Sequence, residues 1–224
     1  MSIINPLYKH IIWDWNGTLL NDVDLVVSIM NSLLKKRNMP QVTKNTYKDI
    51  FGFPVINYYI KLGFDFSEES FDSVSKEFIE LFNISCYTCS LHPYSRQLLK
   101  SFYRMGITQS ILSASEQNSL EEFIDFFDLN NFFVKLIGLD NFHAESKIEK
   151  GKKWITSLPY SSKEILLIGD TLHDYEVSKA LGCDCILVAS GHQKFDKLQS
   201  TGVTVYNSLS DLYADFFAIK LKEA

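Results

Sequence analysis

Three acidic residues of this chain stand directly after short apolar runs, where the buried strands of a parallel sheet would end. Asp14 follows Ile11-Ile12-Trp13, and Asp170 follows the run from Ile165 to Gly169, with Asp174 four residues further on. Carboxylates that gather in one place repel each other unless a cation lies between them. Ligand sets made of oxygen atoms favour Mg2+, which also takes waters and a substrate phosphate. The spacing therefore predicts a Mg2+ site that works on a phosphoryl group.

Two further polar side chains are expected at the same edge of the sheet. Ser113 ends a second apolar run, which begins at Ile107, and Lys147 opens the helix that follows a third run, Phe132–Gly138. Ligands of an open parallel sheet bind outside the carboxyl ends of its strands. There Asp14 could attack phosphorus and form an aspartyl-phosphate, which splits one difficult step into two. Ser113 and backbone N–H groups could hold the phosphate oxygens, while Lys147 and Mg2+ would offset their charge.

The elements that must position these residues alternate along most of the chain. Short continuous apolar runs, typical of strands buried on both faces, are separated by segments with helical periodicity. This alternation predicts an α/β fold with right-handed crossovers, a Rossmann-like parallel sheet with helices on both faces. We predict strands over residues 9–15, 107–113, 132–138, 165–169, 183–189 and 203–206, and helices over 94–105, 117–127, 146–157, 174–181 and 208–220.

One stretch interrupts this alternation. From about Asp22 to Thr88 the sequence shows only helical patterns, and its many aromatic residues need a core of their own. Its breaks fall at Pro40, at Gly52–Pro54 and at Gly63. We therefore predict that residues 21–88 form a small α-helical cap domain inserted after the first strand, and that residues 1–20 and 89–224 form the core domain.

Taken together, these motifs resemble the four motifs of the haloacid dehalogenase superfamily. Asp-x-Asn-Gly-Thr-Leu begins at Asp14, a serine ends the second strand, a lysine opens a helix, and Gly-Asp-x-x-x-Asp begins at Gly169. The helical insert is similar to that superfamily's α-helical cap. The nearest resemblance is to the phosphoglycolate phosphatase-like and β-phosphoglucomutase-like subgroup, and it covers nearly the whole chain. Each motif alone is weak evidence, whereas four in this order are specific.

The resemblance implies a role for each matching residue. The residues expected to bind Mg2+ are Asp14, Asn16 through its backbone carbonyl, Asp170 and Asp174. Those expected to bind phosphate are Gly17, Thr18, Ser113, Ala114 and Lys147. The expected catalytic residues are Asp14 as the nucleophile, Lys147, which would steady the nucleophile and the phosphate, and Asn16. The cap would select the substrate and exclude water when it closes. The turn at residues 52–54 lies where relatives carry a substrate-facing turn, although an ordinary helix break explains it equally well.

Asn16 departs from the family pattern. In the family's phosphatases this position is usually a second aspartate, which protonates the leaving oxygen and later activates water. An amide can do neither. General acid–base catalysis is worth roughly 10²–10⁴-fold in rate, so its loss slows such an enzyme without removing nucleophile or metal. The proton could instead come from His173, from His143 or from a cap residue. An engineered replacement of aspartate at position 16 is also compatible with the sequence.

Two functional hypotheses follow. The leading one is an enzyme, a Mg2+-dependent phosphatase that hydrolyses a small, phosphoglycolate-like phosphate monoester through an aspartyl-phosphate, slowly or on a specialised substrate. The alternative is a catalytically weakened protein that binds phosphate and Mg2+ or has a regulatory role. A dehalogenase is disfavoured, because the carboxylates at Asp170 and Asp174 suit a phosphate bound with Mg2+ better.

Composition limits the partners and the location. The 224 residues carry a net charge of −5 and offer no basic face for nucleic acid. No apolar run could span a bilayer and no leader precedes the first strand, so we expect a cytoplasmic protein without membrane contact. The expected partner is a small phosphorylated metabolite, and the expected oligomeric state is a monomer or a homodimer.

The four cysteines are interpreted as structural. Cys86 and Cys89 form a C-x-x-C motif, but no second pair with zinc-ligand spacing follows it. Cys183 and Cys185 alternate within a predicted strand and would face the same side as small buried residues. A structural metal or a functional disulfide is the minor alternative, because thiols in the cytosol stay reduced.

Overall fold

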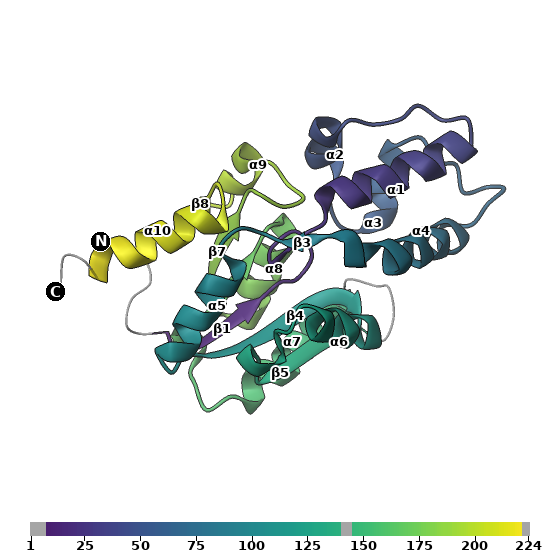
Figure 1. Ribbon diagram of the computed structural model, residues 1–224. Helices are drawn as coiled ribbons and strands as arrows, with labels where there is room; N and C mark the ends of the chain where they lie inside the picture. Colours follow the sequence, from purple (N-terminus) through teal and green to yellow (C-terminus); the bar gives the residue numbers. More distant parts are fainter. Residues whose placement is uncertain (1–7, 140–144, 221–224) are drawn as a thin grey trace.

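The computed structural model describes residues 8–139 and 145–220 and has an α/β architecture (Figure 1). The main sheet consists of β1 (His10–Trp13), β4 (Thr108–Glu116), β5 (Lys135–Leu139), β6 (Ile165–Gly169), β7 (Asp184–Val188) and β8 (Thr204–Tyr206). Its strand order is β5-β4-β1-β6-β7-β8, and every neighbouring pair is parallel. Every residue of β1 and β6 is buried, as continuous apolar runs predict. The predicted Rossmann-like fold class is confirmed.

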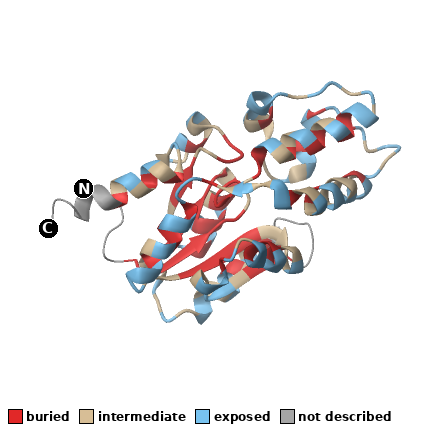
Figure 2. Ribbon diagram, in the orientation of Figure 1, coloured by how far each residue is buried: buried red, intermediate tan, exposed pale blue. Residues whose placement is uncertain are grey.

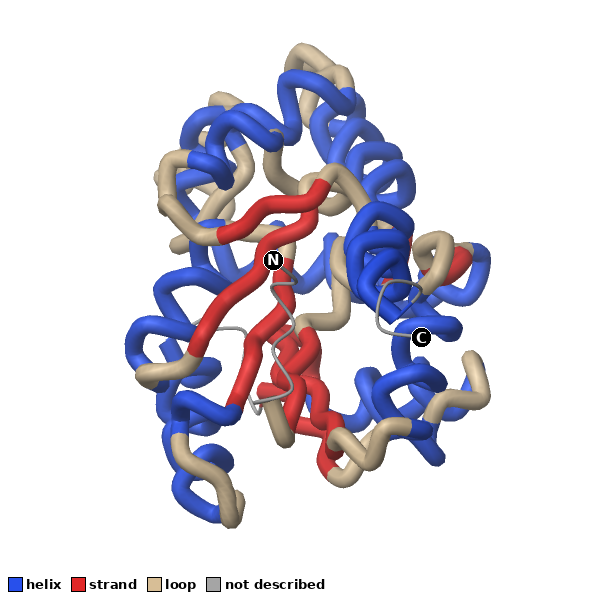
Figure 3. The backbone as a smooth tube through the Cα atoms, turned by 90° about the vertical axis from the view of Figure 1, so that its left-hand side faces the viewer, coloured by secondary structure: helices blue, strands red, loops and turns tan. Residues whose placement is uncertain are grey.

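Helices cover both faces of this sheet (Figure 3). Ile11 and Trp13 belong to one apolar cluster, whereas Ile12 between them belongs to the other, because successive strand residues point to opposite faces. Figure 2 shows the buried strands between the helices, whose outer sides are exposed. The first cluster includes residues of α5 (Ser95–Arg104), α6 (Gln117–Phe126) and α10 (Leu209–Lys220), and the second includes residues of α7 (Glu145–Ser157) and α8 (Leu172–Leu181).

The start of α8 is fixed by a capping box. The Thr171 side chain accepts a hydrogen bond from the Asp174 backbone N–H, and the Asp174 carboxylate accepts one from the Thr171 backbone N–H. The helix ends at Gly182, whose φ of 71° is the left-handed conformation common after a helix. The helix therefore begins directly after β6, and its first turn lies at the carboxyl end of that strand.

Between residues 23 and 85 the chain forms four α-helices and no strand (Figure 1). We call these the cap helices: α1 (Val23–Lys36), α2 (Lys44–Ile50), α3 (Val55–Lys61) and α4 (Phe71–Ser85). Tyr47, Tyr58 and Tyr59 are buried among them, in the same apolar cluster as Trp13 of the sheet. The aromatic residues that required a core thus share one with the main sheet.

A short antiparallel ribbon connects the cap helices to the sheet. It consists of β2 (Leu20–Asn21) and β3 (Ser90–Leu91), and it was not predicted, since two-residue strands have no detectable periodicity. The predicted boundary at residues 20/21 falls within β2, and the one at 88/89 falls just before β3. The division into two domains stays a prediction. Also not predicted were α9 (Phe195–Gln199), the 3₁₀ turns Cys86–Thr88, Asn130–Phe132 and Ser162–Glu164, and the extension of β4 beyond Ser113.

All four cysteines are free. Burial raises the pKa of the Cys86 thiol to about 12 and that of Cys89 to about 11, so both stay protonated near neutral pH. Cys183 lies one residue before β7, and it shares an apolar cluster with Cys185. None of the described helices is both long and apolar enough to cross a membrane.

Candidate active site

The sheet brings the ends of three strands together. β1 lies between β4 and β6, and the Asp14 backbone N–H donates to the carbonyl of Ile168 in β6 at 2.9 Å. The chain runs from β1 to one side of the sheet through β4 and β5, and it then returns to the other side through β6. Such a reversal of strand order opens a crevice at the carboxyl ends of the strands. Asp14 stands in this crevice directly after β1.

Four buried residues form what we call the charged cluster: Asp14, Lys147, Asp170 and Asp174. The Lys147 Nζ donates to Asp14 Oδ1 at 2.7 Å and to Asp174 Oδ1 at 2.8 Å. One carboxylate oxygen from each of the three aspartates lies within 4.8 Å of the other two. The structure thus brings together the four ionisable residues that the sequence predicted to meet.

Asp174 has two tasks in this cluster. Its Oδ1 accepts from Lys147, and its Oδ2 accepts from the backbone N–H of Thr171 at 3.0 Å and from the Thr171 hydroxyl at 2.7 Å. Burial acts to raise its pKa, but Lys147 outweighs burial and the net shift is downward. The same carboxylate therefore stays ionised, caps α8 and holds Lys147.

The other two carboxylates have raised pKa values in the absence of a metal. Burial raises the pKa of Asp14 to about 6, although Lys147 opposes the shift. Burial raises the pKa of Asp170 to about 8, against the effect of His192 and with the repulsion of Asp14 and Asp174. Near neutral pH Asp170 is therefore mostly protonated, whereas Asp14 stays mostly ionised.

The turn after Asp14 needs the residues found there. Gly17 has a φ of 76°, and a Cβ at this position would overlap Asp170 and the ring of His192. Glycine is therefore required by conformation and by space. The Thr18 hydroxyl lies 3.2 Å from Asp14 Oδ2 and 3.0 Å from Asp170 Oδ1, so its single hydrogen serves two carboxylates.

A second set of polar residues surrounds the Asn16 side chain. Asn16 Nδ2 donates to Asp22 Oδ2 at 2.8 Å, and Asn16 Oδ1 accepts from the Ser115 hydroxyl at 2.7 Å. Asp22 Oδ1 lies 3.3 Å from His192 Nε2, and His192 Nδ1 lies 2.8 Å from the Tyr47 hydroxyl. We call these five residues the Asn16 network. It links the turn after β1 to α2 among the cap helices.

The Asn16 network contains an ion pair. Burial acts to raise the pKa of Asp22, but His192 and then Asn16 outweigh it, and the net shift is downward. Burial acts to lower the pKa of His192, yet Asp22 outweighs burial and raises it to about 9. His192 is therefore charged near neutral pH, and it donates to Asp22 through Nε2 and to Tyr47 through Nδ1. Its backbone N–H also donates to Asp170 Oδ2 at 2.6 Å, which joins this network to the charged cluster.

The charges of the two sets suit a divalent cation. Four buried carboxylates, on Asp14, Asp22, Asp170 and Asp174, face two buried cations, Lys147 and His192. With all six groups ionised, two negative charges remain, which one Mg2+ would balance. Burial is the main cause of the raised pKa values of Asp14 and Asp170, and repulsion between the carboxylates adds to it. The oxygen-rich donor set therefore fits Mg2+. Among the described residues, Asp14, Asp170 and Asp174 are the one group of three such potential ligands.

The remaining predicted site residues lie close by. Ser113 is buried in β4 next to β1, and its hydroxyl pairs with Ser115 rather than with Asp14. Ala114 lies between these two serines. His173 packs on the ring of Phe53 with centroids 4.6 Å apart, and its Nδ1 lies 3.4 Å from Glu176 Oε2. Burial lowers the pKa of His173, which disfavours the charged form that could donate a proton. His143 lies outside the described residues.

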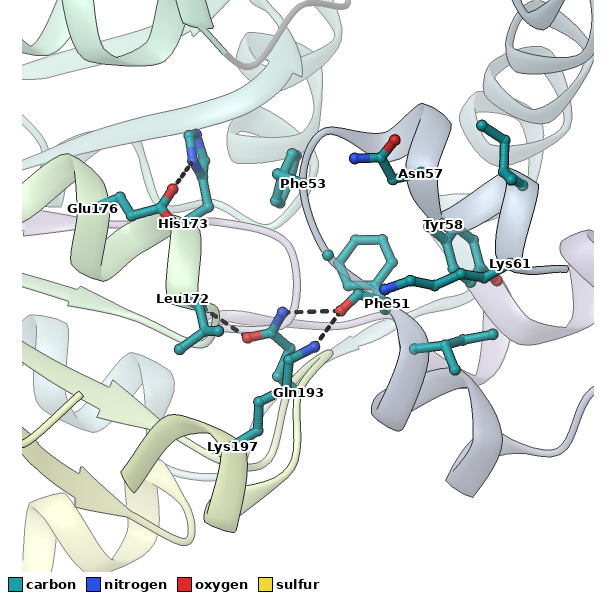
Figure 4. Close-up of a pocket in the computed structure, with 13 residues that line it drawn as sticks. Phe51, Phe53, Asn57, Tyr58, Lys61, Leu172, His173, Glu176, Gln193 and Lys197 are labelled. Atoms are coloured by element: carbon teal, nitrogen blue, oxygen red, sulfur yellow. Dashed lines mark hydrogen bonds and ion pairs between the residues drawn. The ribbon is translucent and has the colours of Figure 1, made fainter. Parts of the chain in front are cut away.

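The cap helices meet the core beside this site. The Lys48 ammonium donates to the carbonyl of Ala189 at 2.8 Å, and Gln193 Nε2 donates to the carbonyl of Phe51 at 3.0 Å. A cavity of about 430 Å³ lies at this junction (Figure 4). The turn around Phe53 and the start of α8 with His173 line it, together with Lys61 and Lys197. The predicted cap turn at residues 52–54 thus faces a cavity that α8 also lines.

Asp22, His192 and Tyr47 were not recognised in the sequence. The sequence pattern places Asp22 at the start of the helical segment, and His192 lies in a loop that matches no motif. One signal was available, because Leu19, Leu20 and Val23 lie within three residues of Asp22, and an acid buried beside such residues needs a partner. For Tyr47 no signal separates it from the other aromatic residues of the cap helices.

Comparison with known proteins gives the family. Residues 11–188 match the family model described as haloacid dehalogenase-like hydrolase. A Vibrio parahaemolyticus protein named phosphoglycolate phosphatase is 21% identical over 214 residues, which cover 91% of this chain and 94% of that protein.

Solved structures share the fold at low identity. A predicted phosphatase from Clostridium acetobutylicum superimposes with a TM-score of 0.79 at 18% identity, covering 94% of this chain and 99% of the other. The Mycobacterium tuberculosis protein named protein tyrosine kinase A superimposes with a TM-score of 0.76 at 20% identity, covering 93% and 97%. The fold alone therefore accompanies more than one named activity. Since the family model matches most of the chain, the protein belongs to the haloacid dehalogenase-like hydrolases, a family of enzymes.

Proposed function

We propose that this protein is a Mg2+-dependent phosphatase that hydrolyses a small phosphate monoester through a phosphorylated Asp14. The observation that carries the proposal is the contact of Lys147 with both Asp14 and Asp174, at 2.7 and 2.8 Å, inside a buried group of three carboxylates. A lysine that held only a structural ion pair would need one carboxylate. Three buried carboxylates that share one lysine suit a site that receives a metal and a phosphoryl group.

The chain's own residues support a two-step displacement. An oxygen of Asp14 forms a bond to phosphorus while the bond to the ester oxygen breaks, and that oxygen leaves with the electron pair. Water then attacks phosphorus, and the bond to Asp14 breaks and returns its electron pair to the carboxylate. A proton of that water passes through solvent to the departed ester oxygen, so that phosphate and an alcohol are released. Lys147 and the Thr18 hydroxyl hold the Asp14 carboxylate before the attack, which limits its freedom to turn away. Backbone N–H groups of the glycine turn after Asp14 are the expected donors to the phosphate oxygens.

Mg2+ would be held by the carboxylates of Asp14, Asp170 and Asp174 and by the backbone carbonyl of Asn16. When bound, it supplies positive charge that offsets the charge of the phosphoryl group in the transition state. The donor set of the charged cluster supports this choice, because it contains oxygen ligands and neither histidine nor cysteine.

The leaving group is expected to depart with little help. Asn16 cannot give a proton to the ester oxygen, and burial keeps His173 in its neutral form. A substrate whose leaving oxygen is stable as an anion would therefore react much faster than a simple alkyl phosphate. The relative from Vibrio parahaemolyticus is named phosphoglycolate phosphatase, and phosphoglycolate is an alkyl phosphate. We propose a small organic phosphate as the substrate class, and we expect its turnover to be slow when the leaving group is an alkoxide.

A second candidate is a protein that binds phosphate and Mg2+ without turnover. Asn16 is the observation that favours it, because it replaces the aspartate that usually carries the proton in the family's phosphatases. The two candidates differ in turnover and agree in binding, so they can be separated by one set of assays.

The test is phosphate release over a panel of monoesters with different leaving groups, with Mg2+ and with EDTA. We expect Mg2+-dependent phosphate release that Asp14→Asn abolishes. Aryl phosphates should be turned over at least about 10²-fold faster than alkyl phosphates, which is the lower end of the rate enhancement that a general acid provides. Lys152→Ala, an exposed substitution on α7, is the control and keeps full activity. Phosphate release that persists in the Asp14→Asn protein would refute the proposal. Binding of phosphate and Mg2+ without release would favour the second candidate.

A further inference from the structure

The Asn16 side chain is held at both ends of its amide. Nδ2 donates to Asp22 at 2.8 Å and Oδ1 accepts from Ser115 at 2.7 Å. The two ends of an amide differ, since one donates and the other accepts, and so these two contacts permit a single orientation. With this orientation the amide oxygen faces Ser115, two residues after Ser113 in β4, and the amide nitrogen faces away from it.

Asp22 is arranged to receive hydrogen bonds and nothing else. Its side chain is fully buried, and three donors converge on it: Asn16 Nδ2, the backbone N–H of Gly17 at 2.9 Å, and His192 Nε2 at 3.3 Å. An ionised carboxylate only accepts, and its two oxygens can take all three. A neutral amide at this position would present an NH₂ group to one of the three donors.

We propose that Asp22 is a positioning residue for Asn16, and that positions 16 and 22 work as one matched pair. The Asp22 carboxylate takes the Nδ2 hydrogen and thereby fixes the Asn16 amide oxygen on the side of Ser113 and Ser115. That is the side of the expected phosphoryl group, where an amide oxygen can hold a hydroxyl or a water by accepting its hydrogen bond. The kinetic part of this inference rests on the proposed phosphatase function, whereas the pairing of Asn16 with Asp22 does not.

The pair explains why an asparagine fits position 16 in this chain. An aspartate there would place a carboxylate oxygen where Nδ2 now lies, 2.8 Å from the Asp22 carboxylate. Two carboxylates so close repel each other. Asn16→Asp alone therefore does not restore a free acid and base, and we expect it to lower turnover. In the double variant Asn16→Asp with Asp22→Asn, the contact between the two side chains again has one donor and one acceptor, and residue 22 is now the donor.

The test is a double-mutant cycle on the full-length protein. Wild type, Asn16→Asp, Asp22→Asn and the double variant are compared by thermal unfolding in EDTA and by kcat and KM with Mg2+ and p-nitrophenyl phosphate. Each single substitution is expected to lower Tm by roughly 5 °C or more, the effect of losing a buried contact in a chain of this size. The double variant should melt above Asn16→Asp, so the two losses are not additive. Asp22→Asn should also lower kcat by about 10–10²-fold, as misplacement of a site residue does, with KM nearly unchanged.

Asp24→Asn is the matched control. Asp24 lies two residues further on, is exposed and pairs with Lys44, so its loss should leave Tm and kcat unchanged. A second cycle with Asn16→Ala, which removes the contact to Asp22 without adding charge, replaces the first if Asn16→Asp does not fold. Asp22→Asn should then lower Tm less in the Asn16→Ala protein than in wild type.

Additive changes in Tm, or a wild-type kcat in Asp22→Asn, would overturn the inference. If wild type itself releases no phosphate, the proposed function fails, and the Tm cycle still decides whether residues 16 and 22 are a matched pair. Non-additive Tm changes together with an unchanged kcat would mean that the pair is purely structural, which contradicts the positioning role.

Discussion

The charged cluster and the Asn16 network lie side by side but are held by different parts of the molecule. All four residues of the charged cluster lie just after strands of the main sheet or on the helices that follow them. The Asn16 network shares the sheet through Ser115 of β4, but its other residues lie in the turn after β1, at the entry to α1, in the loop after β7 and, for Tyr47, on α2. The charged cluster is therefore fixed by the sheet, whereas the Asn16 network depends on the contact between the cap helices and the core.

This difference separates two tasks. Under the proposed function, the charged cluster supplies the nucleophile and the charges that a phosphoryl group requires, and its residues are all positioned by the main sheet and the helices that follow its strands. The Asn16 network sets the orientation of one amide beside that nucleophile, and it is complete only with α2 in place. Substitutions in the first set should remove the chemistry, and those in the second should tune it.

The largest effect is expected from Lys147→Ala. Removing Lys147 leaves Asp14 and Asp174 buried without their cation, and breaking such a pair costs about 3–5 kcal/mol of unfolding free energy. Activity should fall by roughly 10²–10³-fold, as it does when one donor to a developing charge is lost. Urea unfolding and phosphate release measure the two effects.

Lys152→Ala on the same helix is the control for that variant. Lys152 is exposed and pairs with the exposed Glu149, a kind of contact worth less than about 1 kcal/mol. Equal stability of the two variants would mean that the charged cluster is not the buried, cation-dependent unit described above.

A second prediction concerns pH in the metal-free protein. The pKa of Asp14 is raised to about 6, that of Asp170 to about 8 and that of His192 to about 9. A group whose pKa is higher in the folded than in the unfolded chain gives stability that is lost as pH rises through the folded value. The loss from Asp14 is therefore largely complete near pH 6, whereas Asp170 and His192 make the metal-free protein less stable as pH rises from 6 to 9.

Mg2+ should reverse much of this loss, because it binds the ionised carboxylates and not their protonated forms. Thermal unfolding at constant ionic strength is measured at pH 6 and pH 9, with EDTA and with Mg2+. We expect the gain in Tm from Mg2+ to be larger at pH 9. A metal-free Tm that rises from pH 6 to pH 9 would contradict the charge balance of the site.

The smallest effect is expected from Tyr47→Phe in the Asn16 network. This change removes the hydroxyl that pairs with His192 Nδ1 and leaves a buried nitrogen without a partner, which costs about 1–3 kcal/mol. Tyr58→Phe is the matched control. The Tyr58 hydroxyl is buried within the same aromatic group and bonds to none of the described residues, so its removal should not destabilise the protein. Equal losses in both variants would show that Tyr47 acts by packing alone.

The sequence was sufficient for the charged cluster for a physical reason. Residues that follow parallel strands meet at one edge of the sheet whatever their separation in the chain, so the sequence alone places Asp14 and Asp170 together. The strand Ile165–Gly169 was predicted with its observed bounds. Its continuous apolar run ends sharply at Asp170, and such a run leaves little choice of boundaries.

The Asn16 network could not be predicted, because no sequence pattern encodes it. Tyr47 and His192 are 145 residues apart and meet through the packing of α2 against the loop after β7. The conformation of that loop and the packing of the cap helices against the core depend on tertiary contacts, which leave no periodic pattern in the sequence. Asn16 was recognised as a departure, but its partner Asp22 became visible only with the turn that brings them together.

Detection of phosphate on Asp14 tests the central claim most directly. Wild-type protein is mixed with an aryl phosphate and Mg2+, quenched in acid within the first turnover, and digested for mass spectrometry of the peptide that contains Asp14. We predict a phosphorylated Asp14 that forms before phosphate release reaches its steady rate and that is absent from the Asp14→Asn protein. Release of phosphate in wild type without any phosphorylated Asp14, under conditions that trap an acyl phosphate, would contradict the account.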